Sequence, residues 1–372
     1  MIVFAEHWDK VKETTWSGTP YGIYCGLNKL LENELVSLEL RQNLYQRAIR
    51  LFKNKILYRN IDDCGVGDIQ RESSVLATFA KKNQVDSYIM FSEHEFSGIK
   101  DSYVFIDCSV DFTYRKQQEH APYEQYLPLH RERKKSLLTK RERTALEFYR
   151  NCKGILTMGQ WLAEDLVQNT GIAPEKVHCV GGGCNIDVEK IDPSQKKGNK
   201  ILFVGKDFFR KGGVQVLDAF KLIDKEYPGK YTLYIAGPKK WPLHTPIPKN
   251  VVFLGLLTTN ELIKYYNIAD LFVMPSIFEA YGIVFAEALI FGLPCIGRNA
   301  FSMSEFIQPG VNGDLIDTEE PKELANKMLG VLENQTIRKY VNDHRSEYIT
   351  QYSWDNVAQR ILKVIEKDKL LS

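Results

Sequence analysis

Two glutamates that flank a glycine form the most chemically informative pattern in this sequence. Glu279 and Glu287, with seven residues between them, lie in the run PSIFEAYGIVFAE that starts at Pro275. The apolar run LFVM before it predicts a buried strand, and Gly282 stands where a helix is expected to begin. Free amides and the dipole at a helix start favour an anionic group such as a phosphate, and carboxylates suit the hydroxyls of a sugar or a ribose. The competing interpretation is a pair of solvated glutamates, because this spacing is common by chance.

A second group of charged residues follows the strand predicted at Ile201–Val204. The loop reads KDFFRKGG and holds three cations, Lys206, Arg210 and Lys211, beside two glycines. Cations in a glycine-bearing loop between a strand and a helix suit a diphosphate, and exposed loop charges are the competing interpretation. The loop is not a Walker A sequence, and the chain has no well-placed G-x-G-x-x-G, so a nicotinamide-binding fingerprint is not supported.

Predicted strands and helices, which could position these residues, alternate along the whole chain. Strand-like runs separated by helical stretches are typical of parallel α/β sheets. The predicted strands are Ile2–Phe4, Leu35–Leu38, Ser87–Phe91, Tyr103–Ile106 and Gly154–Thr157 in the first half, and Ile201–Val204, Thr232–Ala236, Val251–Leu254, Leu271–Met274 and Cys295–Gly297 in the second. The predicted helices are Tyr21–Glu32, Ile69–Lys82, Arg133–Asn151, Val214–Lys225, Asn260–Ile268 and Gly282–Phe291, followed by consecutive helices over Pro321–Leu371.

Length and composition predict a globular protein of two domains. The chain has 372 residues, and ~150 residues per domain is typical. It is 44% hydrophobic and 26% charged, which excludes a disordered or collagenous chain. Its 49 basic and 47 acidic residues leave a net charge of +2, so attraction of the whole protein to nucleic acid is not expected. The polar run Asp187–Lys200 contains Pro193 and Gly198, and the linker between the domains is expected there.

Cysteine usage and hydropathy indicate a compartment. The seven cysteines are scattered and form no Cys-x-x-Cys pair, as is typical of reduced thiols in a cytoplasm. No segment reaches the roughly 18 uncharged apolar residues of a membrane-spanning helix, and the N-terminal MIVFAEHWDK has no basic leader. No Asp is followed by another Asp two positions later, and the histidines show no ligand spacing, so no metal site is expected.

Five blocks of the C-terminal half occur in the order found in a known enzyme family. They are GKDFFRKGG, LYIAGP, VVFLG, ADLFVMPS and EAYGIVFAEALIFGLPCIG, and the first half adds TWSGTPYGIYCGL. The chain resembles the retaining glycosyltransferases of family 4 (glycosyl transferases group 1), most clearly over residues 151–320. This resemblance implies the α/β fold called GT-B, with two Rossmann-like, doubly wound parallel-sheet domains facing a central cleft. It implies an acceptor-binding domain over 1–190, a nucleotide-sugar-binding domain over 191–350, and a C-terminal helix over 351–372 that crosses back to the first domain.

The resemblance also assigns roles to the charged residues. Glu279 matches the glutamate that contacts hydroxyls of the donor sugar, and Glu287 matches the one that holds the ribose of the nucleotide. Lys211 matches the lysine of the family's basic pair, whereas Lys206 stands where the family has an arginine. Arg210 adds a further cation, so the main diphosphate contact is left open between Lys206 and Arg210. On this basis Glu279, Lys211 and Arg210 are predicted to be catalytic as well as donor-binding.

Backbone groups and two positions in the first half complete the expected site. The donor-binding set includes the residues that lead into the predicted helix, namely Ala280, Tyr281, Gly282 and Ile283, and the last two are expected to present amides to the phosphate. Gly18 is expected either to close a loop over donor and acceptor or to be a plain helix-start turn, with Pro20 at the first helical position. Asp107 is predicted to be catalytic, in the place that many family members give to a histidine, and Asp111 is the competing residue.

The predicted function is a retaining transfer of a hexose from a UDP- or GDP-sugar to a glycan or lipid-linked acceptor in bacterial surface polysaccharide synthesis. No metal and no cofactor are expected. The alternatives are another GT-B nucleotide-sugar enzyme, of epimerase or phosphorylase type, or a non-catalytic binder of nucleotide or RNA. The basic stretch RERKKSLLTKRER at 131–143 is expected either to contact an anionic membrane from the cytoplasm or to be a solvated helix face. It lacks interleaved aromatic residues, so no nucleic acid partner is expected.

Overall fold

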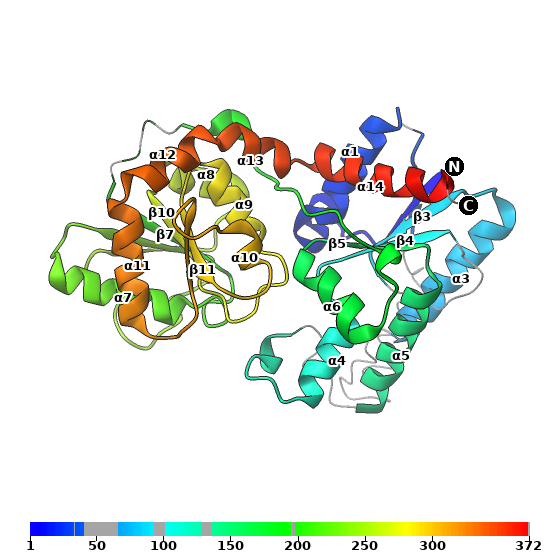
Figure 1. The fold of residues 1–372 in the computed structure, drawn as a ribbon, viewed down its shortest axis with the longest axis horizontal. Coiled ribbons are helices and arrows are strands. Elements are labelled where there is room, and N and C mark those ends of the chain that lie inside the picture. Colours follow the sequence, from blue (N-terminus) through cyan, green and yellow to red (C-terminus); the bar gives the residue numbers. More distant parts are fainter. Residues whose placement is uncertain are drawn as a thin grey trace. The chain divides into compact units, whose positions relative to one another are not determined.

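Two parallel sheets organise the part of the chain that the structure, a computed structural model, describes. The described residues are 1–32, 34–40, 66–92, 101–127, 135–192, 194, 196 and 198–370. Residue contacts divide the chain into a first unit, Met1–Gly182 with Trp354–Ser372, and a second unit, Gly183–Ser353. Each unit has its own six-stranded sheet with helices around it (Figure 1). Within the described ranges, every helix is too short or too polar to cross a membrane.

The sheet of the first unit is parallel throughout and has the strand order β2-β1-β3-β4-β5-β6. Every residue of β3, β4 and β5 is buried, as expected of parallel strands covered on both faces. The strand order reverses between the neighbouring strands β1 and β3, so the switch point of the sheet lies between them. The strands are β1 (Ile2–Glu6), β2 (Val36–Glu39), β3 (Ser87–Met90), β4 (Ser102–Ile106), β5 (Gly154–Thr157) and β6 (Val177–Cys179).

Helices cover the first sheet and include the last helix of the chain. They are α1 (Thr19–Leu30), α3 (Val66–Lys82), α4 (Val110–Gln118), α5 (Lys135–Asn151), α6 (Gln160–Thr170) and α14 (Trp354–Leu370), with the 3-10 helices η1 (Lys12–Gly18), η3 (Glu124–Tyr126), η4 (Pro174–Lys176) and, in the second unit, η5 (Val188–Lys190). Residues 131–134 of the basic stretch, and the side chains of 135–137, lie outside the described residues. The remainder of that stretch belongs to α5, where Leu138 is buried.

The C-terminal helix α14 packs against α1, where glycines leave room for it (Figure 1, red against blue). A Cβ atom on Gly22 would lie 2.3 Å from the Trp354 ring, and one on Gly26 would lie 2.7 Å from the Trp354 carbonyl oxygen. Lys29 of α1 and Asp355 of α14 form an ion pair of 2.5 Å. The absence of side chains at two α1 positions therefore permits the close approach of the two helices.

The sheet of the second unit is also parallel, in the order β12-β11-β10-β7-β8-β9. The chain runs outward from β7 to β9 and then outward from β10 to β12 on the other side, which is the Rossmann order with its switch point between β7 and β10. The strands are β7 (Lys200–Val204), β8 (Thr232–Ala236), β9 (Val251–Gly255), β10 (Leu271–Val273), β11 (Cys295–Arg298) and β12 (Gly313–Ile316).

Two helices of the second unit, α8 and α9, begin at helix-start signals in the sequence. Thr258 and Glu261 form a capping box at the start of α8, and Gly282, in the left-handed region with φ 91°, precedes α9. The helices are α7 (Gly213–Glu226), α8 (Thr259–Ile268), α9 (Ile283–Ile290), α10 (Met303–Phe306), α11 (Pro321–Glu333), α12 (Gln335–Asp343) and α13 (Arg345–Gln351). The prediction of two Rossmann-like, doubly wound α/β units is confirmed, although β6 and β12 were not among the predicted strands.

Candidate functional site

The loops that leave β7 and β10 contain most of the predicted site residues. These strands are neighbours in the sheet, with Leu271 opposite Ile201, and the strand order reverses between them. The loop after β7 carries the cations, and the loop after β10 carries Glu279 and leads into α9. Open α/β sheets bind ligands outside the carboxyl ends of their strands at this kind of switch point. The fold therefore brings together the two patterns that the sequence presents separately.

The cations of the first loop and the glutamate of the second meet directly. Lys211 Nζ forms an ion pair with Oε2 of Glu279, and Arg210 Nη1 lies 3.6 Å from the same oxygen. Arg210 Nη1 also donates a hydrogen bond of 2.6 Å to the carbonyl oxygen of Phe278. The exposed fractions of the Lys211, Arg210 and Glu279 side chains are 13%, 21% and 10%. Lys206, by contrast, is exposed at the start of the loop.

Ser276, which the sequence analysis did not single out, joins the two loops. Its buried hydroxyl lies 3.2 Å from Glu279 Oε2, 3.2 Å from the Phe278 carbonyl oxygen and 3.3 Å from that of Arg210. The Ile277 amide donates a further hydrogen bond of 2.8 Å to the Arg210 carbonyl oxygen. These contacts fix the backbone of the basic loop against the acidic one. The only sequence signal for this role is the place of Ser276 between the apolar strand and Glu279.

Burial affects the ionisation of Lys211. It lowers the pKa of Lys211, and the adjacent Glu279 carboxylate opposes that effect. An ammonium group that is shielded from water acts on a nearby anion through a lower effective dielectric constant than an exposed one does. Lys211, held beside Glu279, can therefore stabilise negative charge that develops next to it more strongly than the exposed Lys206 can.

The start of α9 lies immediately after Glu279. Gly282 precedes the helix with no side-chain cap, and a Cβ atom there would lie 3.0 Å from Cγ of Glu279. Ala280 accepts a hydrogen bond of 2.5 Å from the buried Ser302 hydroxyl, and the Tyr281 ring is buried. The two residues before Gly282 are thus fixed from outside the loop. The helix start beyond them, at Ile283, is a position at which backbone amides can meet an anion.

Glu287 lies within α9 and is held by a tyrosine from α8. The Tyr266 hydroxyl donates a hydrogen bond of 2.9 Å to Oε2 of Glu287, and the tyrosine ring stacks on Phe291 with 5.2 Å between ring centroids. Burial raises the pKa of Glu287 to about 7, against the effect of the tyrosine hydrogen bond. Tyr266 was not predicted from the sequence, because nothing in the pattern of α8 pairs it with a residue of α9.

The raised pKa predicts a specific pH dependence of stability for Glu287→Gln. An unfolded glutamate ionises near its model value of 4.5, whereas folded Glu287 keeps its proton up to about pH 7. The folded state therefore binds the extra proton between these values, and the free energy of unfolding falls as pH rises through that window, by about 3 kcal/mol. Urea unfolding of the second unit should show this fall in the wild type and lack it in Glu287→Gln. Equal slopes in the two proteins would mean that Glu287 ionises normally.

Gly18 of the first unit lies at the start of α1, outside the loops described above. It has a left-handed backbone with φ 86° and precedes the helix without a side-chain cap. Trp16 and Ser17, which come before it, also have positive φ values, of 42° and 57°. A tight backbone reversal therefore leads into α1, and this geometry agrees with a helix-start turn as well as with a loop that contacts a ligand.

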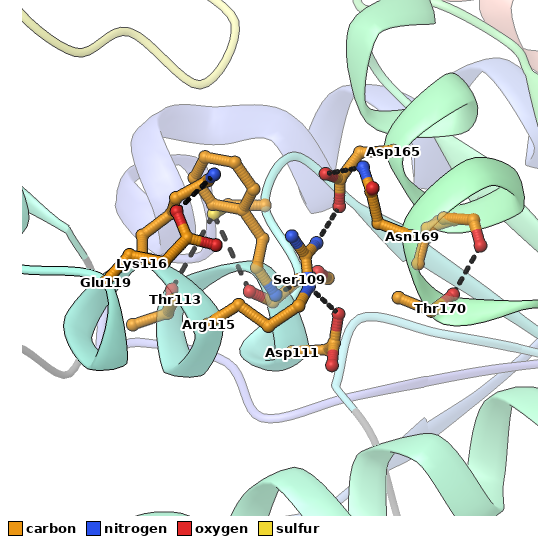
Figure 2. A network of polar contacts seen from close by, with 12 residues as sticks. Ser109, Asp111, Thr113, Arg115, Lys116, Glu119, Asp165, Asn169 and Thr170 are labelled. Atoms are coloured by element: carbon orange, nitrogen blue, oxygen red, sulfur yellow. Dashed lines mark hydrogen bonds and ion pairs between the residues drawn. The ribbon is translucent and has the colours of Figure 1, made fainter. Parts of the chain in front are cut away.

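The two aspartates that compete for a catalytic role differ in their surroundings. Asp107 follows β4 and is half-buried, whereas Asp111 is buried in the first turn of α4. Arg115 bridges Asp111 and Asp165, with Nε–Oδ2 and Nη2–Oδ2 distances of 2.7 and 2.5 Å (Figure 2). The Ser109 hydroxyl caps the same helix by accepting a hydrogen bond from a backbone amide. Asp111 thus has a structural explanation in joining α4 to α6, and Asp107 stays the predicted residue.

Glu6, at the carboxyl end of β1, is shielded by the fold, and burial raises its pKa to about 8. No sequence pattern distinguished this glutamate from an exposed one. Over the described stretches of the chain, no three His, Cys, Asp or Glu side chains gather closely enough to hold a metal ion.

Comparison with known proteins identifies the domain that contains the two loops. Residues 187–351 match the protein family described as Glycosyl transferases group 1. An uncharacterized glycosyltransferase of Methanocaldococcus jannaschii, MJ1607, is 29% identical over 238 residues, which are 59% of this chain and 61% of that protein. The chain spans less than two thirds of the length of this relative.

Solved structures resemble the chain over nearly its full length. WaaG, a glycosyltransferase involved in lipopolysaccharide biosynthesis, has a TM-score of 0.62 at 14% identity, over 98% of this chain and 99% of that one. Anabaena Alr3699/HepE in complex with UDP-glucose has a TM-score of 0.63 at 14% identity, with the same coverage. At this identity the likeness concerns the fold, and it confirms the GT-B architecture.

Proposed function

We propose, from the match of residues 187–351 to glycosyl transferases group 1, that the protein is a retaining glycosyltransferase that takes a hexose from a nucleotide-diphosphate sugar. The observation that carries the proposal is the ion pair of Lys211 with Glu279 beside the start of α9, at the switch point of the second sheet. Cations, helix-start amides and a carboxylate are the groups that a diphosphate and a sugar need within a short distance of each other. The donor is proposed to be a UDP- or GDP-sugar.

In the proposed complex, each group of the donor meets one part of the site. Lys211 and Arg210 bind the diphosphate, and the amides of Gly282 and Ile283 bind one of its phosphates. Glu279 accepts hydrogen bonds from sugar hydroxyls, and Glu287 accepts them from the ribose. The complex of Anabaena Alr3699/HepE with UDP-glucose, which shares the fold, supports a nucleotide sugar as the ligand. Arg210, which already approaches Glu279, is preferred over the exposed Lys206 as the second diphosphate contact.

The proposed reaction breaks the bond between the anomeric carbon and the diphosphate oxygen. Positive charge develops on the sugar and negative charge on the leaving diphosphate, which Lys211 and Arg210 stabilise. For retention, the acceptor attacks the face that the diphosphate leaves, and a departing phosphate oxygen takes the acceptor proton. The electron pair of the broken bond stays on the diphosphate, and the acceptor oxygen forms the new glycosidic bond. These cations supply the charge for a reaction that we propose to be independent of a metal and of any cofactor.

The acceptor is proposed to be a glycan or lipid-linked saccharide bound by the first unit, in which Asp107 is the proposed catalytic residue and Gly18 is proposed to contact the donor. WaaG, a glycosyltransferase involved in lipopolysaccharide biosynthesis, has a similar fold and supports a role in surface polysaccharide synthesis. A cytoplasmic location is part of the proposal, because the described cysteines are free thiols, as is usual in a reducing compartment. Contact of the stretch 131–143 with an anionic membrane surface on the inner face stays a prediction.

The direct test is release of nucleoside diphosphate from a panel of UDP- and GDP-sugars. A donor that binds is first found by thermal shift, because a ligand at 100 times its Kd stabilises the fold by about 2.7 kcal/mol. We expect the protein to release UDP or GDP from that donor and Glu279→Ala to lose at least about 10²-fold in rate. Glu333→Ala is the matched control, since Glu333 faces Lys230 at 3.7 Å on the surface of the same unit.

The alternative functions give different results in this test. Binding without release of nucleotide would indicate a non-catalytic binder. A changed sugar that is still attached to its nucleotide would indicate an epimerase, and release that depends on added phosphate would indicate a phosphorylase. Nuclear magnetic resonance of the product reports whether the anomeric configuration is retained, and inversion would overturn that part of the proposal.

A further inference from the structure

We infer that Glu279 makes the donor site discriminate between an intact nucleotide sugar and the free nucleoside diphosphate. The inference rests on the proposed function, in which Lys211 and Arg210 bind the diphosphate. In the structure, Glu279 is the counter-ion of the same two cations. A diphosphate that binds there must therefore displace a carboxylate that is already in place.

The contacts of Glu279 converge on one oxygen atom. Oε2 forms the ion pair with Lys211, lies 3.6 Å from Nη1 of Arg210, and lies 3.2 Å from the Ser276 hydroxyl. Only 7% of the residue is exposed, so water contributes little to its solvation. The charge of this carboxylate is therefore balanced mainly by the two cations.

The backbone around Glu279 is held in place, which keeps the carboxylate within side-chain reach of the cations. The next residue, Ala280, is tied to the buried Ser302 hydroxyl by a hydrogen bond of 2.5 Å. Gly282 lies beside the glutamate stem, since a Cβ atom there would lie 3.0 Å from Cγ of Glu279. When a ligand takes the cations, the carboxylate must stay near them and find other hydrogen-bond donors.

The two ligands differ in what they offer the displaced carboxylate. A free nucleoside diphosphate takes the cations and brings further negative charge, which leaves a buried carboxylate beside an anion, at a high cost. An intact donor also carries a sugar bonded to the diphosphate, and the hydroxyls of that sugar can donate hydrogen bonds to the carboxylate. Glu279 therefore penalises the free diphosphate more than the donor, and the same penalty favours release of the product after transfer.

The test compares the affinities of two ligand classes in Glu279→Gln, measured by isothermal titration calorimetry with UDP, GDP and the matching sugar donor. We expect the variant to bind the free diphosphate more tightly, on the order of tenfold, because the glutamine carries no charge to displace. The intact donor is expected to bind equally or more weakly, because the glutamine is a weaker acceptor for sugar hydroxyls. Product inhibition by the free diphosphate should strengthen in the same proportion.

Two further variants test whether the gain in diphosphate affinity is specific to Glu279 and depends on Lys211. Glu333→Gln removes an exposed carboxylate opposite Lys230, at 3.7 Å, and is expected to leave both affinities unchanged. In the Lys211→Met background, Glu279→Gln is expected to give much less gain in diphosphate affinity, because the contested cation is absent. A full gain in that background would mean that Glu279 acts through general repulsion and not through Lys211.

The outcomes separate this inference from the proposed function. Suppose that the wild type binds the nucleotide and releases it from a sugar donor, but Glu279→Gln lowers the affinity for the free diphosphate or leaves that affinity unchanged. The inference is then wrong, and the glycosyltransferase proposal stands. If the wild type binds neither UDP nor GDP nor their sugars, the proposed function and the inference both fail. Tighter binding of the free diphosphate, together with equal or weaker binding of the donor, supports the inference.

Discussion

Replacing Lys211 with methionine is expected to lower the rate of glycosyl transfer about 10²–10³-fold, the usual effect of removing one preorganised group that stabilises developing charge. Methionine keeps most of the length of the side chain and removes the ammonium group. Negative charge on the leaving diphosphate is greater in the transition state than in the bound donor. The loss should therefore appear mainly in kcat, with a smaller rise in KM.

The measurement is steady-state release of nucleoside diphosphate at saturating donor, with direct titration of donor binding alongside. Lys225→Met is the matched control, because Lys225 is exposed in the last turn of α7 in the same unit. It should keep the wild-type kcat. An unchanged kcat in Lys211→Met, with only weaker donor binding, would contradict the role of Lys211 in the transition state and leave it as a ground-state contact.

The sequence was sufficient for the elements that carry the site, because their signals are local. The apolar run before Pro275 predicted a strand, and β10 occupies Leu271–Val273. Gly282 was expected to begin a helix, and α9 starts at the next residue. Predicted boundaries differ by one or two residues at several ends. The helix predicted from Tyr21 begins at Thr19, since Pro20 is compatible with the first turn of α1.

The two strands that were not predicted, β6 and β12, have weak local signals for a physical reason. β12 begins with Gly313 and Asp314, residue types that are disfavoured in strands. A Cβ atom on Gly313 would lie 1.9 Å from the Cys295 carbonyl oxygen of β11, so the close pairing of these strands requires glycine there. The three-residue β6 (Val177–Cys179) is too short for an alternating pattern.

Contacts between residues far apart in the sequence were beyond the reach of pattern analysis. The basic loop and the pair of glutamates Glu279 and Glu287 were each recognised, but the ion pair of Lys211 with Glu279 depends on β7 and β10 being neighbours in the sheet. The contact of the Ser276 hydroxyl with the Arg210 carbonyl oxygen depends on the same packing, and the hydrogen bond from Tyr266 to Glu287 depends on α8 lying beside α9. The site could therefore be predicted as a list of charged residues, and the groups that position them could not.

Replacing Gly212 with alanine is expected to destabilise the second unit by about 3 kcal/mol or more and to abolish transfer activity. Gly212 ends the basic loop in the left-handed region, with φ 77°, where a non-glycine residue costs roughly 1–2 kcal/mol. Its Cβ atom would also lie 2.5 Å from the carbonyl oxygen of Pro275, a residue of the acidic loop. The overlap must push apart the loops that hold Lys211 and Glu279, and overpacking of this kind adds about 1–3 kcal/mol.

Gly229→Ala separates the backbone cost from the overlap. Gly229 has a similar φ of 74°, and no atom lies within 4 Å of the position its Cβ would take. This control should lose only the left-handed cost of about 1–2 kcal/mol and keep its activity. Urea unfolding and diphosphate release, measured on both variants, test the argument. Equal destabilisation with equal activity would show that the two loops tolerate a methyl group between them, and the close approach of Gly212 to Pro275 would then have no part in holding Lys211 against Glu279.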